Sequence, residues 1–205
     1  YLSPRFFSKH LGALGYPDGD WQGLPTDYST SVIGNVSTAW IESVSSSSRP
    51  FFAYIGVKAA HEPFTPAPWY ANHWDATWPK REPRTPNWNC SYESRKDHHG
   101  CIAEMPMLNE AAESVITGAF KNRWRTLLSL DDLVLEAYAA CERAGVLQHT
   151  YFISTSDHGY QLGQFNILMD KRHVYDWDTR VPFIIRGPGI SAGVRFEEPA
   201  TLADL

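Results

Sequence analysis

Four polar residues that could do chemistry follow two short apolar runs of the sequence. His61 lies soon after the first run, Asp157 and His158 follow the second, and Lys171 lies thirteen residues beyond His158. An aspartate with a neighbouring histidine can hold a cation, while a lysine and a second histidine can neutralise or protonate a tetrahedral anion bound to that cation. The pattern therefore indicates a site for a metal ion together with an oxyanion.

Each of these residues also has a structural interpretation. Asp157-His-Gly is a common kind of turn in which the aspartate bonds local backbone amides, and Lys171 beside Arg172 suits a solvated surface. His61, before Glu-Pro, suits a partly buried loop histidine. From the residues alone, both the functional and the structural interpretations stay open.

Other polar clusters are weaker candidates for a site. Asp131 and Asp132 lie in the middle of an expected helix, where paired carboxylates usually face solvent or a helix junction. Cys90, Cys101 and Cys141 lack C-x-x-C spacing, so the sequence does not indicate a zinc site.

The elements that must position the candidate residues alternate between helices and strands. Apolar spacing predicts helices from Ser29 to about Val44 and from about Asn109 to Gly145, the second with a break near Gly118. Apolar, β-rich runs predict buried strands at 51–57, 150–155 and 181–185. This order favours an α/β fold with a mostly parallel sheet covered by helices on both faces, and functional loops at the strand ends.

Residues 62–108 interrupt this alternation. Prolines recur through the segment, and four tryptophans lie between Trp69 and Trp88, which excludes a long regular element. A loop of this length in a compact domain is usually functional or an insertion. The tryptophans suit stacking on sugars, although such a loop serves at least as often for packing.

Composition excludes some classes of partner. The 205 residues carry a net charge of −5, so binding to nucleic acid through a basic face is not expected. No run of 18 apolar residues occurs, so no membrane span is expected either.

Several segments, in order, resemble the type I sulfatases of the alkaline-phosphatase-like superfamily, with the nearest likeness in the N-acetylglucosamine-6-sulfatase and arylsulfatase branch. The resemblance rests on Thr155-Ser-Asp-His-Gly-Tyr-Gln-Leu-Gly-Gln-Phe, Asp170-Lys-Arg-His-Val-Tyr-Asp, Arg180-Val-Pro-Phe-Ile-Ile-Arg-Gly-Pro-Gly, and stretches around His61, Lys121 and Thr201. It implies that residues 1–205 are part of a sulfatase catalytic domain, with residues 62–108 as an insertion.

The resemblance implies roles for the four candidate residues. Asp157 and His158 match the positions that hold the divalent ion, usually Ca²⁺; His158 stands where many members have asparagine. Lys171 matches the lysine that contacts the sulfate oxygens. His61 matches the histidine that protonates the leaving oxygen or holds the sulfate. Lys58 matches no recurrent position and is a possible substrate contact only.

The chain also departs from the family pattern. The nucleophile of sulfatases is a formylglycine made from the cysteine of C-x-P-x-R, and none of the three cysteines lies in such a motif. The early Asp-Asp metal pair is missing too. We therefore expect a fragment whose N-terminal part is absent, and no sulfatase activity from the 205 residues alone.

Two sequons, at Asn35 and Asn89, permit N-glycosylation in a secretory compartment. Cys90 and Cys101 are eleven residues apart and could form a disulfide. Both features suit a secreted or lysosomal protein.

Three functions remain open from the sequence. The first is a sulfuric ester hydrolase acting on a sulfated sugar, such as N-acetylglucosamine 6-sulfate, or on an aryl sulfate. The second is a phosphodiester or phosphonate ester hydrolase of the same superfamily. The third is a non-catalytic, carbohydrate-binding relative.

Overall fold

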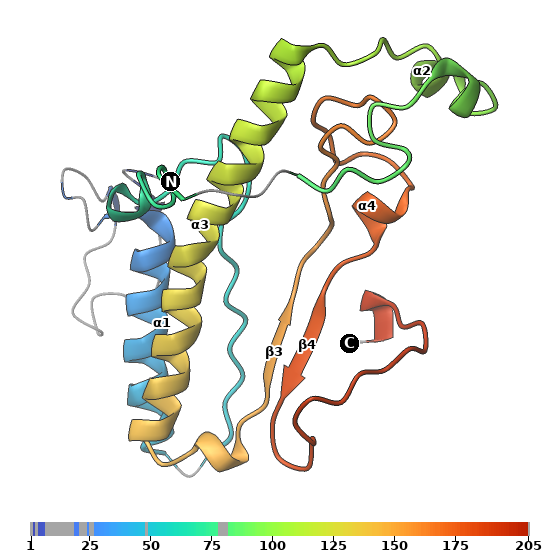
Figure 1. Cartoon of the computed structure of the whole chain (residues 1–205). Coiled ribbons are helices and arrows are strands. Elements are labelled where there is room, and N and C mark those ends of the chain that lie inside the picture. The colour runs from blue at the N-terminus through green and yellow to red at the C-terminus, as the bar shows by residue number, and fades with distance from the viewer. Residues whose placement is uncertain are drawn as a thin grey trace.

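The protein is described by a computed structural model covering residues 2, 4–6, 19–20, 24, 27–47, 49–77 and 82–204. Its helices are α1 (Ser29–Ser45), α2 (Gly100–Ala103), α3 (Glu110–Arg143) and α4 (Asp176–Thr179), with short 3₁₀ turns at Pro68–Tyr70, Tyr92–Ser94, Leu147–His149 and Leu202–Asp204. Its strands are β1 (Arg5–Phe6), β2 (Gly19–Asp20), β3 (Phe152–Thr155) and β4 (Phe183–Arg186). Helices α1 and α3 lie side by side, and β3 and β4 form a narrow ribbon beside them (Figure 1).

Helix α3 is the longest element, and its two ends follow from local sequence. The Asn109 side chain accepts a hydrogen bond from the backbone N–H of Ala112 at 2.9 Å, which satisfies one of the unpaired donors at the helix start. Gly145, at a φ of 71°, lies just beyond the last turn, where a left-handed residue commonly ends a helix. The predicted end of the helix at Gly145 is confirmed. The predicted break near Gly118 is wrong, because α3 continues through that residue.

Helices α1 and α3 pack closely because a glycine faces a leucine between them. A Cβ atom added to Gly34 would lie 3.2 Å from the Leu133 side chain, so a larger residue would have to displace that side chain by a few tenths of an ångström. One apolar core lies near the C-terminal ends of α1 and α3. Its buried members are Ile41, Ala137, Ala140, Cys141 and Leu147.

A second core connects α3 to the segment 62–108 and to the loop after β3. Its buried members are Phe64, Trp88, Ile116, Ala119 and Leu162. The Trp88 indole Nε1 donates to the Leu162 backbone carbonyl at 2.9 Å. This tryptophan therefore packs inside the protein. Trp78 lies outside the described residues.

The strands differ from the sequence prediction. Strands β3 and β4 pair antiparallel, with Phe152 opposite Arg186, so a parallel sheet is not confirmed. The prediction that both strands are buried is wrong for this chain, because most of their residues are exposed. Strand pairing depends on which segments meet in space, and local apolar runs carry no information about direction.

The predicted strand at 51–57 is absent, although the segment is extended. Phe51 packs edge-on against Trp40 at 5.8 Å between ring centroids, whereas Phe52 and Tyr54 are 84% and 88% exposed. The run has no strand partner among the described residues. An apolar run predicts extended backbone correctly here, but not the hydrogen-bonded partner that defines a strand.

The helices also bear on whether the chain could cross a membrane. None of those in the described part of the chain combines the length and the apolar character needed to span a bilayer.

Replacing Ile116 with alanine is expected to lower the free energy of unfolding by about 2–4 kcal/mol, because its fully buried side chain fills the second core. The neighbouring Val115 is half exposed and serves as a matched control, with an expected loss under about 1 kcal/mol for Val115→Ala. Chemical denaturation followed by circular dichroism measures both. Equal losses for the two variants would contradict this core assignment.

Candidate active site

The candidate residues from distant parts of the sequence meet at one cavity of about 230 Å³. Its walls are residues 57–62, residues 156–160, Arg123 from α3, and Lys171. All four predicted site residues, His61, Asp157, His158 and Lys171, are therefore brought together, although the first and last are 110 positions apart.

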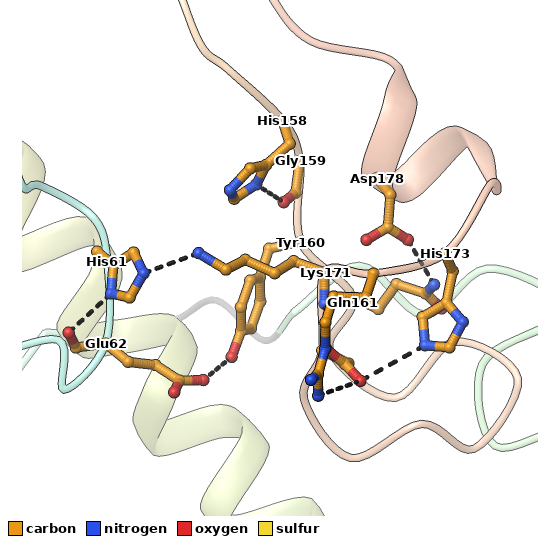
Figure 2. Close-up of polar contacts among 11 residues, drawn as sticks. His61, Glu62, His158, Gly159, Tyr160, Gln161, Lys171, His173 and Asp178 are labelled. Carbon is orange, nitrogen blue, oxygen red and sulfur yellow. Dashed lines mark hydrogen bonds and ion pairs between the residues drawn. The ribbon is translucent and has the colours of Figure 1, made fainter.

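Lys171 and His61 form the polar centre of this cavity. The Lys171 ammonium Nζ lies 2.7 Å from His61 Nε2, and the two side chains point toward each other (Figure 2). His61 Nδ1 lies 2.9 Å from the Glu62 backbone carbonyl, which only accepts, so Nδ1 carries a hydrogen. Nε2 then accepts a hydrogen bond from the Lys171 ammonium at the cavity wall.

Asp157 and His158 form a second polar pair on the same cavity. His158 Nδ1 lies 2.8 Å from the Gly159 backbone carbonyl and therefore donates to it. His158 Nε2 then lies 3.3 Å from Asp157 Oδ2, and the Asp157 side chain is 82% exposed. A lone pair and a carboxylate oxygen this close are stabilised by a proton or a cation between them.

These two donors fit part of a cation site. Calcium takes six to eight oxygen-rich ligands, whereas Asp157 and His158 supply one carboxylate and one imidazole. Over the residues that the structure describes, no cluster of three or more His, Cys, Asp or Glu side chains could hold an ion. Asp157 Oδ1 also accepts the His158 backbone N–H at 3.0 Å, so the turn expected from the structural interpretation is present as well.

The loop after β3 is held in place by α4. The Gly159 N–H donates to the Asp178 carbonyl at 2.7 Å, and the buried Gln161 side chain donates to the Asp178 carboxylate at 2.6 Å. A Cβ atom at Gly159 would lie 2.0 Å from the Trp177 carbonyl oxygen. Only glycine fits this close approach, which sets the direction of the chain between His158 and the next residues.

Lys171 is positioned by its neighbours in a similar way. The Asp170 carboxylate accepts the Lys171 backbone N–H at 2.7 Å and the Arg172 Nε–H at 3.0 Å. The hydrogen bond from Arg172 lowers the pKa of Asp170, with the Lys171 backbone adding to the effect. Gln161 donates its backbone N–H to the Asp170 carbonyl at 2.8 Å, which joins this loop to the one that carries Asp157.

Three residues that the sequence did not single out also line the cavity: Glu62, Arg123 and Tyr160. The Tyr160 hydroxyl donates to Glu62 Oε1, across 98 positions of sequence. Burial, followed by this hydrogen bond, raises the pKa of the Tyr160 phenol, which keeps it a donor. The Arg123 guanidinium lies over the Tyr160 ring at 4.6 Å. No local motif marks such a cluster, because its members come from three separate segments.

The other predicted positions lie away from the cavity. Asn35 is exposed on α1. The Asn89 side chain accepts a hydrogen bond from the Leu108 backbone N–H at 2.7 Å and donates one to the Leu108 carbonyl at 3.1 Å.

Cys90 is buried and Cys101 exposed, and both are free thiols, so the disulfide predicted between them is absent from the structure. Cys90 lies in a loop that Arg95 organises through its bond to the Cys90 carbonyl. Asp132 accepts a hydrogen bond from the Tyr70 hydroxyl at 2.9 Å.

Comparison with known proteins agrees with this picture. A family model described as Sulfatase matches residues 6–205. The N-acetylglucosamine-6-sulfatase of Capra hircus is 37% identical over 188 residues, which cover 91% of this chain and 32% of that protein. An arylsulfatase of Volvox carteri is 33% identical over 190 residues, covering 82% of this chain and 28% of that protein.

The fold has a counterpart among solved structures. The crystal structure of yidJ from Bacteroides fragilis, assigned to the sulfatases, superposes with a TM-score of 0.59 at 15% identity, covering 79% of this chain and 31% of that chain. This likeness supports an alkaline-phosphatase-like α/β fold. The chain spans about a third of the length of the N-acetylglucosamine-6-sulfatase it matches.

Proposed function

This chain belongs to the sulfatase family, and from that membership we propose that the full-length protein is a sulfuric ester hydrolase. The observation that carries the proposal is the meeting of Lys171 and His61 with Asp157 and His158 at one cavity. A cation site facing a lysine and a histidine suits a tetrahedral anion whose oxygens gain charge during hydrolysis. Residues 1–205 are then part of the catalytic domain, with residues 62–108 inserted in it.

The proposed substrate is a sulfated sugar such as N-acetylglucosamine 6-sulfate, with an aryl sulfate as the second choice. Support comes from the branch resemblance and from the relatives, one an N-acetylglucosamine-6-sulfatase and one an arylsulfatase by name. The substrate's sulfate would be recognised by local groups, since the net charge of −5 describes the whole chain and not the cavity.

Lys171 and His61 would act on the sulfate ester directly. The Lys171 ammonium would donate hydrogen bonds to the sulfuryl oxygens and offset the charge that develops on them. Once the Lys171 ammonium turns to the sulfate, a His61 imidazolium would carry a hydrogen on Nε2 as well, give it to the leaving alcohol oxygen, and return to the neutral Nδ1–H form while Lys171 stays charged. The Glu62 backbone carbonyl, bonded to Nδ1, keeps the imidazole in that orientation.

Asp157 and His158 would supply two ligands of a divalent cation, which we propose is Ca²⁺. Such an ion would neutralise charge on the sulfuryl oxygens when bound. The nucleophile is proposed to be a formylglycine from a part of the protein outside these 205 residues, since the described cavity lining contains no cysteine.

We also propose a secretory location, secreted or lysosomal. The exposed Asn35 sequon is the favoured acceptor of N-linked glycan. Asn89 is the weaker acceptor, because its amide already bonds the Leu108 backbone and because cysteine occupies the middle of its sequon.

The full-length protein is expected to release sulfate from N-acetylglucosamine 6-sulfate in a reaction that needs a divalent cation, and the 205 residues alone are expected to release none. Ion chromatography of sulfate measures both, with 4-nitrophenyl sulfate and bis(4-nitrophenyl) phosphate as comparison substrates. Hydrolysis of the phosphodiester alone would favour the second superfamily activity. Binding of the sugar without any hydrolysis would favour the non-catalytic relative.

A further inference from the structure

We infer that Glu62 determines specificity by accepting a hydrogen bond from a sugar hydroxyl next to the sulfate ester, so that carbohydrate sulfates are preferred over aryl sulfates. This inference rests on the proposed function and goes beyond it, because it assigns the choice of alcohol to one side chain. The role is one of substrate binding, separate from the roles of Lys171 and His61.

Glu62 lies beside the residues that the proposed function places on the sulfate. It directly follows His61, and it lines both the cavity of about 230 Å³ described above and a second hollow of about 270 Å³. Tyr160 and Lys171 also line both hollows. A substrate whose sulfate lies at Lys171 therefore has the Glu62 carboxylate within its immediate surroundings.

The Glu62 carboxylate is oriented, although its residue is exposed. The Tyr160 hydroxyl donates to Oε1, and Figure 2 shows the carboxylate turned toward this hydroxyl. The Tyr160 ring is itself fixed, with Phe64 edge-on at 5.7 Å and the Arg123 guanidinium over its face at 4.6 Å. With Oε1 engaged, Oε2 remains a charged acceptor that a ligand hydroxyl can reach.

The charge of Glu62 explains the direction of the selectivity. A carboxylate beside an anionic sulfate repels the substrate unless the substrate brings donors to it. A sugar carries hydroxyl groups that donate, whereas an aryl ring carries none. The same side chain therefore favours one class of alcohol and disfavours the other, which is how specificity commonly arises.

The test compares Glu62→Ala with the wild type in the full-length protein on two substrates. With N-acetylglucosamine 6-sulfate, kcat/KM is expected to fall about 10- to 100-fold, mainly through KM, because a hydrogen bond to a charged acceptor is lost. With 4-nitrophenyl sulfate, kcat/KM is expected to stay unchanged or rise. Glu62→Gln, which keeps an acceptor oxygen, should show a smaller loss on the sugar. The exposed Glu136 on α3 gives the matched control, Glu136→Ala.

The role of Tyr160 is tested in the same assay. Tyr160→Phe should produce part of the Glu62→Ala loss on the sugar, and adding it to Glu62→Ala should cause no further loss, since its effect acts through the carboxylate.

The outcomes separate this inference from the function it rests on. Equal losses on both substrates, or no loss on the sugar, would overturn the role of Glu62 while sulfatase activity stands. A wild-type protein that hydrolyses neither sulfate ester would overturn the proposed function itself. A loss on the sugar ester with no loss on the aryl ester supports both.

Discussion

Replacing Lys171 with alanine in the full-length protein is expected to lower kcat for sulfate ester hydrolysis about 100- to 1,000-fold. The Lys171 ammonium lies 2.7 Å from His61 Nε2 at the cavity wall, so its loss removes both a positive charge facing the sulfuryl oxygens and the donor to His61. Steady-state kinetics on a chromogenic sulfate ester measure the change. Circular dichroism checks that the variant is folded.

The matched control for this variant is Lys96→Ala. Lys96 is exposed and pairs with Glu93, three residues away in a surface turn, so kcat should remain within about twofold of the wild type. If Lys171→Ala kept wild-type kcat, the assignment of the sulfate to this part of the cavity would be wrong.

Replacing Asp157 with asparagine is expected to reduce activity at least about 100-fold, because a ligand and a negative charge are removed from the proposed cation site. It should also remove the rise in melting temperature that added Ca²⁺ gives the full-length wild type, since an ion that binds the native state stabilises it. Thermal denaturation with and without Ca²⁺ reads this effect independently of activity.

Asp176→Asn provides the control, since Asp176 is an exposed aspartate of α4 outside the cavity lining. It should keep both the activity and the response to Ca²⁺. An Asp157→Asn protein that is still stabilised by Ca²⁺ to the wild-type extent would show that the ion binds elsewhere.

The helices were the part of the fold that could best be predicted from the sequence. The apolar spacing of α1 and α3 repeats over many turns, and Asn109 and Gly145 mark the ends of α3 with side-chain and backbone chemistry that acts locally. The strands were harder to predict from the sequence. Residues 51–57 carry the same kind of apolar run as β3, but only β3 has a hydrogen-bonded partner among the described residues.

The candidate site also has one part that could be predicted from the sequence and one part that could not. His61, Asp157, His158 and Lys171 could be chosen because their residue types and family positions indicate chemistry, and the structure brings them to one cavity. Glu62 and Tyr160 could not be paired in advance. Their contact crosses 98 positions and depends on how the segment that begins at residue 62 folds back against α3.

The exposed strands β3 and β4 affect how residues 1–205 behave in solution when they are produced without the rest of the protein. In the part of the chain that the structure describes, β3 and β4 each pair along one edge only, and Ile153, Phe183 and Ile184 are each about half exposed or more. An open strand edge beside apolar side chains is a template for another chain. Residues 1–205 expressed alone are therefore expected to aggregate through the β3–β4 ribbon even when α1 and α3 are folded. Their solubility depends on whether other polypeptide covers these two strands.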